Sequence, residues 1–321
     1  MKAYFNPRYG GPETLSIQDI PMPEVREKDL LIRMLRTTVN RTDCGFLRGE
    51  PWLARLYAGF RKRRFPVLGN EFAGEIVATG SGVTSFKKGD LVFGFDDAGF
   101  GCHAEFKTIP ENGPVSLIPV GLNLDKAVAI TEGAHYALCD LRAAKVKEGQ
   151  KVLVHGATGA IGSAAVQLAL FFGAEVTAVC DTPNMEKIRS FGPHRLVDRL
   201  KEDFTRVPGH YDLVFDAVGK SSFRACKPLL TKNGIYISTE LGEGWENPFL
   251  GLLGLFQSGK RVLFPLPTSS REDTEFLGER AQMGDLVPLI DRVYSFEEIP
   301  EAYRYVETGQ KIGNVVVKIA D

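Results

Sequence analysis

A glycine-rich segment between two apolar runs is the part of this chain best suited to hold a charged ligand. The run Lys151–His155 predicts a buried strand, and residues 163–170 have the spacing of a helix. Glycine in the turn between them permits unusual backbone angles and close approach of a pyrophosphate, and a helix N-terminus attracts anions. The pattern also occurs in ordinary tight turns. The residues expected at a dinucleotide pyrophosphate are Gly156, Ala157, Thr158, Gly159, Ala160, Ile161 and Gly162.

The segments that follow favour the dinucleotide interpretation. Apolar runs predict strands at 175–180, 195–198, 211–216, 234–238 and 261–264, with helices at 183–191 and 221–230. Strands that alternate with helices predict an α/β fold with a doubly wound parallel sheet. Ligands of such sheets bind outside the carboxyl ends of the strands. That rule adds further residues to the expected cofactor site: Asp181, Ala217, Val218, Gly219 and Thr239.

The two ends of the chain have a different sequence pattern from the middle. The first 120 residues carry short apolar runs separated by Gly and Pro turns, which predicts an antiparallel or barrel-like region. A helix is expected over 125–141, leading into the glycine-rich strand. After 266 the chain returns to short strands around two helices. We therefore expect one domain from residues 1–120 and 267–321, with a dinucleotide-binding domain at 121–266 inserted in it.

The composition of the chain indicates which kinds of partner and which cellular compartment to expect. The chain has 321 residues and a net charge of −1, which does not suggest a nucleic-acid partner. The basic run Arg61–Arg64 is interpreted as a solvated loop. The five cysteines are scattered without a C-x-x-C pair, as in reduced cytoplasmic proteins. The start of the chain lacks the apolar core of a signal peptide, and no apolar run is long enough to span a membrane.

Several motifs, in this order, resemble those of one enzyme superfamily over nearly the whole chain. They are Val39–Asp43, Pro66–Gly74, Phe86–Phe93, Gly101–Phe106, Phe215–Gly219 and Gly309–Val316. Together they resemble the medium-chain dehydrogenase/reductase superfamily, in its zinc-independent quinone oxidoreductase-like branch, often labelled NAD(P)-dependent alcohol dehydrogenase. The resemblance implies a mostly-β, GroES-like catalytic domain, a Rossmann domain and an active site in the cleft between them.

The resemblance also bears on metal binding. Zinc-dependent relatives carry two cysteines and a histidine as zinc ligands where this chain has Asn40, Asn70 and Thr131. Amide and hydroxyl groups are poor zinc ligands. The pair Cys102-His103 could belong to a different metal site, but we interpret it as two strand residues that face opposite ways. We therefore expect no metal. Without zinc to polarise a carbonyl, hydride addition to an acceptor that is already electrophilic remains accessible.

The resemblance suggests catalytic and cofactor residues. Asn40 matches a polar position beside the nicotinamide, although it could also cap a local turn. Arg41 matches a pyrophosphate contact, or is a surface arginine. Thr42 matches the relay hydroxyl of zinc-dependent enzymes. His135 falls near the carboxamide position, or is a structural histidine. Asn314 matches a position near the nicotinamide end.

Cofactor preference depends on the end of the second Rossmann strand. Related sequences often have serine and arginine where this chain has Asp181 and Pro183. A carboxylate binds the ribose hydroxyls of NADH and repels the 2′-phosphate of NADPH. The sequence therefore predicts NAD(P)H binding with a preference for NADH. Lys187, Arg189 or Arg195 could offset this preference.

The leading function is hydride transfer from NAD(P)H to a quinone or an α,β-unsaturated carbonyl. One alternative is an alcohol or aldehyde dehydrogenase that works without the usual zinc site, and another is a cofactor-binding interaction protein with little catalysis. An aromatic-lined substrate pocket could use Phe46, Trp52, Tyr57, Trp245 and Phe249. The strand at 261–264 lies at the expected sheet edge, where relatives dimerise, so a homodimer is expected.

Overall fold

The computed structural model describes residues 1–52, 54–60, 63–254, 256 and 258–321. The chain forms two compact units, each described by itself. The first comprises residues 1–132, 269–283 and 290–321, and the second comprises residues 133–268 and 284–289. The domain limits expected from the sequence, 120/121 and 266/267, remain a prediction.

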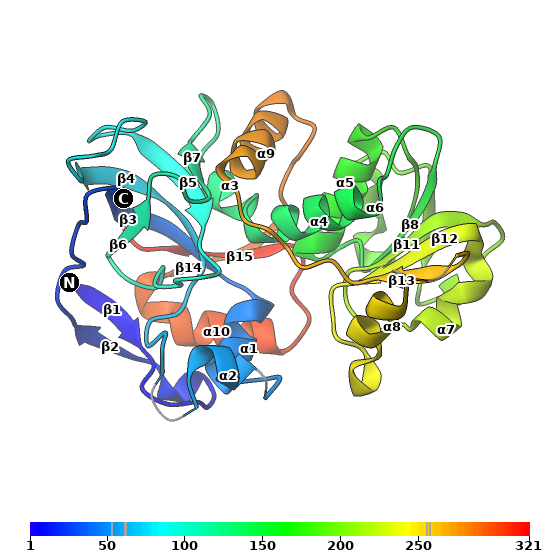
Figure 1. The fold of residues 1–321 in the computed structure, drawn as a ribbon, viewed down its shortest axis with the longest axis horizontal. Coiled ribbons are helices and arrows are strands. Elements are labelled where there is room, and N and C mark those ends of the chain that lie inside the picture. The colour runs from blue at the N-terminus through cyan, green and yellow to red at the C-terminus, as the bar shows by residue number, and fades with distance from the viewer. Residues whose placement is uncertain (53, 61–62, 255, 257) are drawn as a thin grey trace. The chain divides into compact units, whose positions relative to one another are not determined.

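The second unit contains a six-stranded parallel sheet with helices on both faces (Figure 1). The strand order is β10-β9-β8-β11-β12-β13. Its strands are β8 (Lys151–His155), β9 (Glu175–Cys180), β10 (Arg195–Asp198), β11 (Tyr211–Asp216), β12 (Leu230–Ser238) and β13 (Arg261–Leu263). Its helices are α4 (Glu132–Ala143, whose first residue belongs to the first unit), α5 (Ala160–Phe171), α6 (Met185–Arg189), α7 (Phe223–Cys226) and α8 (Glu246–Gly254). This confirms the predicted doubly wound α/β fold.

Local sequence accounts for these elements. The strands at the middle of the sheet are buried on both faces, so they read as continuous apolar runs; Val152, Leu153 and Val154 are all fully buried. The central helix α5 is also largely buried. The predicted helix at 221–230 is shorter than expected, because Pro228 and the start of β12 end α7 early.

The first unit is built on a seven-stranded, mostly antiparallel sheet. Its order is β14-β15-β3-β4-β5-β7, with β6 also paired to β3. The strands are β3 (Asp29–Val39), β4 (Glu71–Thr79), β5 (Leu91–Phe95), β6 (Phe106–Pro110), β7 (Val115–Leu117), β14 (Ile290–Ser295) and β15 (Asn314–Lys318), beside a hairpin of β1 (Lys2–Phe5) and β2 (Ser16–Asp19). β15 pairs antiparallel with β3. The C-terminal segment therefore rejoins the N-terminal region, as predicted.

Helices of the first unit carry residues of the candidate site. They are α1 (Arg41–Arg48), α2 (Ala54–Ala58), α3 (Leu124–Ala129), α9 (Arg271–Met283) and α10 (Ile299–Glu307). Figure 1 shows α1 beside α2 and α10. The core beneath them joins Val39 and Leu47 to Tyr303 and Val315.

The predicted helix at 125–141 is instead two helices. α3 ends at Ala129 and α4 begins at Glu132. Between them the hydroxyl of Thr131 donates to the carbonyl oxygen of Val128 at 2.7 Å. A threonine hydroxyl that competes for backbone groups favours a helix end over a helix interior. The break leaves the hydroxyl of Thr131 and the N–H of Glu132 available to a carboxylate from β4.

The basic run at 61–64 differs from the solvated loop expected. Residues 61 and 62 lie outside the described residues. Arg63 is buried, and its guanidinium lies 4.2 Å from the ring centroid of Tyr9, a cation–π contact. Arg64 lies over the rings of Tyr57 and Phe65. Arg63 therefore departs from the expectation, whereas Arg64 is exposed, as the expectation of a solvated loop requires.

No helix in the described part of the chain combines the length and the apolar character that a membrane crossing requires.

Candidate active site

The glycine-rich turn joins β8 to α5 and matches the sequence prediction. Gly156 has a φ of +82°, and a Cβ there would lie 2.5 Å from Cγ1 of Val218. A Cβ on Gly162 would lie 2.1 Å from the carbonyl oxygen of Gly156. Gly159 has an ordinary φ of −73°, and its Cβ would meet only that same oxygen, at 3.6 Å. The turn itself therefore requires two glycines, and the third leaves open space at the N-terminus of α5, where an anion would bind.

The other residues of the turn are consistent with an anion site at the N-terminus of α5. Ala157 is fully buried, and its N–H donates to the carbonyl oxygen of Val179 at 3.1 Å. Thr158, Ala160 and Ile161 are half-buried. The residues present therefore fit a dinucleotide pyrophosphate.

A buried aspartate at the end of β11 shapes the neighbouring loop. Oδ1 of Asp216 accepts hydrogen bonds from the N–H groups of Val218 and Gly219 and lies 3.0 Å from Nδ1 of His155. Oδ2 accepts from the N–H of Ser221 at 2.9 Å. Burial alone would raise the pKa of Asp216, but the His155 contact and these hydrogen bonds lower it overall. The carboxylate thus holds the loop after β11, where the predicted cofactor residues are half-buried: Ala217, Val218, Gly219 and, after β12, Thr239.

The end of β9 carries an ion pair that the sequence analysis missed. Nη2 of Arg199 donates to Oδ2 of Asp181 at 2.8 Å, and Nε of Arg199 contacts Oδ1. The contact is bidentate, the strong form of an arginine–carboxylate pair. Arg189 pairs with Glu186, and Arg195 donates to the carbonyl oxygen of Pro208. Arg199 follows β10, so its pairing with Asp181 depends on the β9–β10 register.

His135 lies on α4 and is fully buried. Its Nε2 lies 3.5 Å from Sγ of Cys139, one helical turn away, and its ring stacks edge-on against Tyr136. The expected place of His135 near the nicotinamide carboxamide stays a prediction.

Asn40 has two roles in the first unit. Its Oδ1 accepts from the N–H of Asp43, and the Asp43 carboxylate accepts from the N–H of Asn40, which makes a capping box at α1. The capping alternative is therefore observed. Its Nδ2 also donates to Oδ1 of Asn70 at 2.9 Å and to Oε2 of Glu71 at 3.1 Å. Asn40 thus joins the helix cap to a buried polar cluster.

Glu71 is the centre of that cluster and is almost fully buried. Its Oε1 accepts from the hydroxyl of Thr131 and, at 2.8 Å, from the N–H of Glu132. Its Oε2 accepts from the hydroxyl of Thr38 and from Asn40. Four donors therefore satisfy one buried carboxylate, as burial of a charge requires.

Glu132 forms the second acidic group of the cluster. Nδ2 of Asn70 donates to Oε1 of Glu132 at 3.0 Å and to Oδ1 of Asp97 at 2.6 Å. Burial, followed by the charges of Glu71 and Asp97, raises the pKa of Glu132 well above its ordinary value. The sequence analysis did not select Glu71 or Glu132, although both adjoin positions that it discussed, Asn70 and Thr131.

The donor chemistry of the cluster does not fit the zinc site of the superfamily. The amide nitrogens of Asn40 and Asn70 are directed at carboxylates, and the Thr131 hydroxyl donates to Glu71. Zinc sites use thiolate, imidazole or carboxylate ligands instead. The Cys102-His103 pair also differs from expectation, because both residues are buried outside a regular strand. Nε2 of His103 lies 2.9 Å from the carbonyl oxygen of Thr38.

Two predicted residues, Arg41 and Asn314, and one that was not predicted, Lys311, also belong to the first unit. Arg41 is exposed at the first position of α1. Asn314 is buried at the start of β15, where its Nδ2 donates to the carbonyl oxygen of Ala129 at 3.1 Å. Lys311 was not predicted. Burial lowers its pKa, while the charges of Glu71 and Glu132 raise it. Its Nζ donates to the carbonyl oxygen of Gly313 at 2.5 Å.

The aromatic residues that were predicted to line one substrate pocket are divided between the two units. Phe46 and Tyr57 lie in the first unit and share an aromatic cluster with Phe65 and Phe100; the Phe46 and Phe100 centroids are 4.6 Å apart. Trp52 is exposed. Trp245 and Phe249 belong to the second unit.

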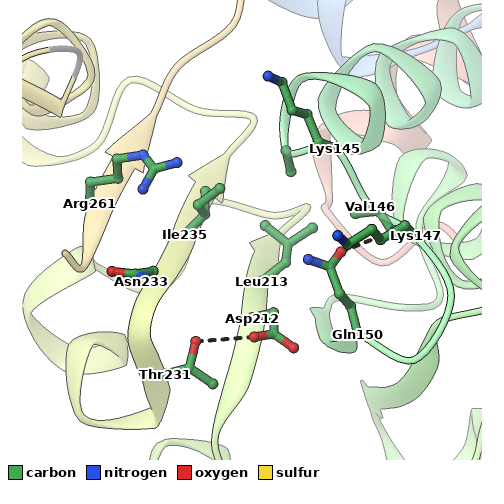
Figure 2. Close-up of a pocket in the computed structure, with 11 residues that line it drawn as sticks. Lys145, Val146, Lys147, Gln150, Asp212, Leu213, Thr231, Asn233, Ile235 and Arg261 are labelled. Atoms are coloured by element: carbon green, nitrogen blue, oxygen red, sulfur yellow. Dashed lines mark hydrogen bonds between the residues drawn. The ribbon is translucent and has the colours of Figure 1, made fainter. Parts of the chain in front are cut away.

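A cavity of about 600 Å³ lies in the second unit at the edge of the sheet where its strands begin (Figure 2). Figure 2 shows the Thr231 hydroxyl donating to Asp212 and the Lys147 N–H donating to Gln150. Ligands of doubly wound sheets bind at the carboxyl ends of the strands, where the glycine-rich turn lies. The cavity is therefore not the candidate cofactor site.

Two family models match parts of the chain. Residues 26–120 match the family described as "Alcohol dehydrogenase GroES-like domain", and residues 191–317 match "Zinc-binding dehydrogenase". The quinone oxidoreductase structure from Coxiella burnetii has a TM-score of 0.89 at 25% identity, covering 100% of this chain and 99% of that chain.

Curated relatives extend over nearly the whole chain. The trans-enoyl reductase pgmF of Aspergillus terreus is 30% identical, covering 90% of this chain and 86% of the relative. The 2-methylene-furan-3-one reductase of Solanum lycopersicum is 28% identical, covering 99% and 79%. The "NADPH-dependent alkenal/one oxidoreductase, chloroplastic" of Arabidopsis thaliana is 27% identical, with the same coverage. The chain therefore belongs to the medium-chain dehydrogenase/reductase superfamily, in its quinone oxidoreductase-like branch.

Proposed function

We propose that the protein is a zinc-independent reductase that transfers a hydride from NAD(P)H to a quinone or an α,β-unsaturated carbonyl. The observation that supports this proposal is the set of hydrogen bonds that Asn40, Asn70 and Thr131 donate to carboxyl groups. These residues replace the zinc ligands of the superfamily and donate hydrogen bonds to Glu71 and Glu132. An acceptor that is already electrophilic does not need a metal to polarise it. The names of the relatives, which include enone and enoyl reductases, agree with this substrate class.

The chain's own residues would bind and orient the cofactor. The N–H groups at the start of α5 would hold the pyrophosphate, and Gly156 and Gly162 keep the turn open for it. Asp216 would keep the loop after β11 in place at the same sheet edge. When bound, the reduced nicotinamide supplies the hydride.

The test is a turnover assay of the purified protein with NADH or NADPH and three acceptors: a benzoquinone, a 2-alkenal and a simple ketone. We expect reduction of the first two, unchanged by a zinc chelator, and little reduction of the ketone. Alcohol oxidation that depends on stoichiometric zinc would instead support the dehydrogenase alternative. Cofactor binding without turnover of any acceptor would support the interaction-protein alternative.

For the cofactor we propose a preference for NADH, set by the pair of Asp181 and Arg199. The pair is neutral overall, and Arg199 can contact a 2′-phosphate only by leaving Asp181. Asp181→Ser should free Arg199 and remove the repulsive carboxylate. We therefore expect the ratio of NADPH to NADH affinity to rise by roughly tenfold to 100-fold, about 1.4–2.7 kcal/mol. Fluorescence titration with both cofactors measures the ratio.

Two matched variants control this prediction. Adding Arg199→Gln to Asp181→Ser should return the ratio toward its starting value. Arg195→Gln should leave the ratio unchanged, because Arg195 bonds to the Pro208 carbonyl oxygen and not to Asp181. If Asp181→Ser alters neither affinity, the pair does not select the cofactor.

We propose that the protein is a homodimer, in which the sheet edge at 261–264 contacts a second copy of the chain. β13 is the last strand of its sheet, and an edge strand invites pairing. The helix packed on β13, α8, exposes Phe249 and Leu252 (63% and 59%). We expect light scattering to give twice the 35.3 kDa chain mass. Leu252→Asp should shift the protein toward monomer, whereas Leu200→Asp, at a similarly exposed leucine near β10, should not. A monomeric wild type would contradict the proposal.

We also propose a cytoplasmic location. The support is that none of the five cysteines is in a disulfide and four of them are buried. Named relatives include chloroplastic and mitochondrial proteins, so microscopy of the full-length tagged protein is the deciding test.

A further inference from the structure

The cavity at the starting edge of the parallel sheet has an apolar floor and a cationic rim (Figure 2). Its volume of about 600 Å³ lies within the roughly 300–1,000 Å³ range of small-molecule sites. The apolar side chains of Val146, Leu213 and Ile235 form the floor. In Figure 2, Leu213 and Ile235 lie between Arg261 on β13 and the segment that follows α4. The floor offers a surface to the apolar part of a ligand.

The rim of the cavity carries more positive than negative charge. Three cations line it, namely Lys145, Lys147 and Arg261. Within the described part of the chain, none of the three has an ion-pair or side-chain hydrogen-bond partner. The lining contains one acidic residue, whereas the whole chain has a net charge of −1. The cavity is therefore a local positive site on a weakly acidic protein, which favours an anion as its ligand.

The hydrogen bonds of the lining leave donors for that anion. Both oxygens of the acidic residue, Asp212, are used: Oδ1 accepts from the Thr231 hydroxyl at 3.1 Å, and Oδ2 accepts from the N–H of Lys151 at 3.0 Å. Oε1 of Gln150 accepts from the N–H of Lys147 at 3.0 Å. The amide nitrogen of Gln150 can therefore donate to a bound molecule, as can the three cations.

Lys145 occupies a position where the end of α4 favours glycine. Its N–H donates to the carbonyl oxygen of Arg142 at 2.9 Å, and the N–H of Val146 donates to that of Leu141 at 3.0 Å. This pair of bonds is the Schellman motif, in which the residue at the place of Lys145 is usually glycine. The φ of Lys145 is +55°, in the left-handed region, where a side chain is strained. Lysine is thus unfavourable for the backbone here, and a role of its ammonium in the cavity accounts for it.

We propose that this cavity binds a small organic anion, whose carboxylate or phosphate group contacts Lys145, Lys147 and Arg261 and whose apolar body packs on Leu213 and Ile235. The guanidinium of an arginine can bind two oxygens of such a group at once. The site lies where β8, β11, β12 and β13 begin, whereas the glycine-rich turn follows the end of β8. It is therefore a second ligand site, and it does not depend on the proposed function.

Calorimetric titration of the purified protein tests the ligand class with four probes: hexyl phosphate, hexanoate, hexanol and inorganic phosphate. We expect hexyl phosphate or hexanoate to bind at least about tenfold more tightly than hexanol or inorganic phosphate, because only the first two can use both the rim and the floor. The tighter of the two identifies the head group as phosphate or carboxylate. If no probe binds, or if neither exceeds the two partial probes, the proposal is wrong.

Variants of the two lysines test the rim. Lys145→Gly and Lys147→Gln should each weaken binding of the tighter probe by about two- to fivefold, and the double variant by roughly tenfold. Lys145→Gly should also raise the urea midpoint, because glycine suits the left-handed backbone, so its weaker binding could not come from a less stable fold. Lys232→Gln, at an exposed lysine outside the lining, should bind as wild type. Wild-type affinity in the double variant would overturn the proposal.

The lysine variants are also separate from the proposed dimer contact. Both lysines precede β8, and β11 and β12 lie between β8 and β13 in the sheet. We therefore expect the variants to keep the oligomeric state of the wild type, which light scattering measures. A loss of binding in the variants then reports on the cavity and not on the 261–264 edge.

Methyl NMR of protein labelled at isoleucine locates the bound anion. The Ile235 signal, assigned by its loss in Ile235→Val, should shift when the tighter probe is added. Saturating NADH should leave the affinity for that probe unchanged, because the two sites lie at opposite ends of the strands. Shifts confined to other isoleucines, or displacement of the probe by NADH, would overturn the proposal and leave the proposed function standing. A protein that reduces neither quinone nor enone would overturn the proposed function and leave this site standing.

Discussion

Replacement of Gly162 by alanine is expected to weaken NADH and NADPH binding by roughly 100-fold or more, about 2.7 kcal/mol. The added Cβ would lie 2.1 Å from the carbonyl oxygen of Gly156 and 2.8 Å from its carbonyl carbon. Both are backbone atoms, so no side-chain rotation can relieve the overlap. The turn must move, and the N–H groups at the start of α5 move with it. Fluorescence titration of the variant with both cofactors measures the loss.

Gly159 offers a matched control within the same turn. Its φ is −73°, and an added Cβ would make only an ordinary contact of 3.6 Å. Gly159→Ala should therefore keep the thermal stability of the wild type. It should still weaken cofactor binding by a smaller factor, because the methyl group occupies the open space at the helix N-terminus. Wild-type affinity in both variants would show that the cofactor binds elsewhere.

Replacement of Glu71 by alanine is expected to lower the free energy of unfolding of the first unit by about 3–5 kcal/mol. Four donors lose their acceptor, and two of them, the N–H of Glu132 and Nδ2 of Asn40, cannot turn toward water without moving the backbone or the α1 cap. A buried donor left without a partner costs about 1–3 kcal/mol. Glu71→Gln should cost less, since its amide oxygen can still accept from the Glu132 N–H. Urea denaturation measures the change.

The control for Glu71 lies on the same strand. Glu75 pairs with Arg33 at 2.5 Å, but both side chains are partly exposed. Surface ion pairs contribute about 0–1 kcal/mol, so Glu75→Gln should shift the urea midpoint little. If Glu71→Ala unfolds at the same urea concentration as Glu75→Gln, the cluster does not stabilise the unit. The far larger effect expected at Glu71 follows from its burial.

The parts of the fold that the sequence predicted well depend on local patterns. β8, β9, β10 and β11 have the predicted bounds, because a buried parallel strand needs only a short run of apolar residues. Gly156 and Gly162 could be recognised because the turn leaves no room for a Cβ, a constraint visible in residue type alone. The helix at 125–141 was predicted as continuous, whereas the structure has two helices there. A hydroxyl at Thr131 and a carboxylate far away in sequence break it.

The amino-acid sequence by itself determined the α/β fold, with its parallel sheet and its glycine-rich turn between β8 and α5. These follow from residue types at fixed spacing along the chain. Only the tertiary structure decided which groups meet, such as Arg199 with Asp181 and Glu132 with Asn70. Strand register and burial decide which residues far apart in the sequence become hydrogen-bond or ion-pair partners. The same burial, which removes water from Glu132, raises the pKa of its carboxyl group.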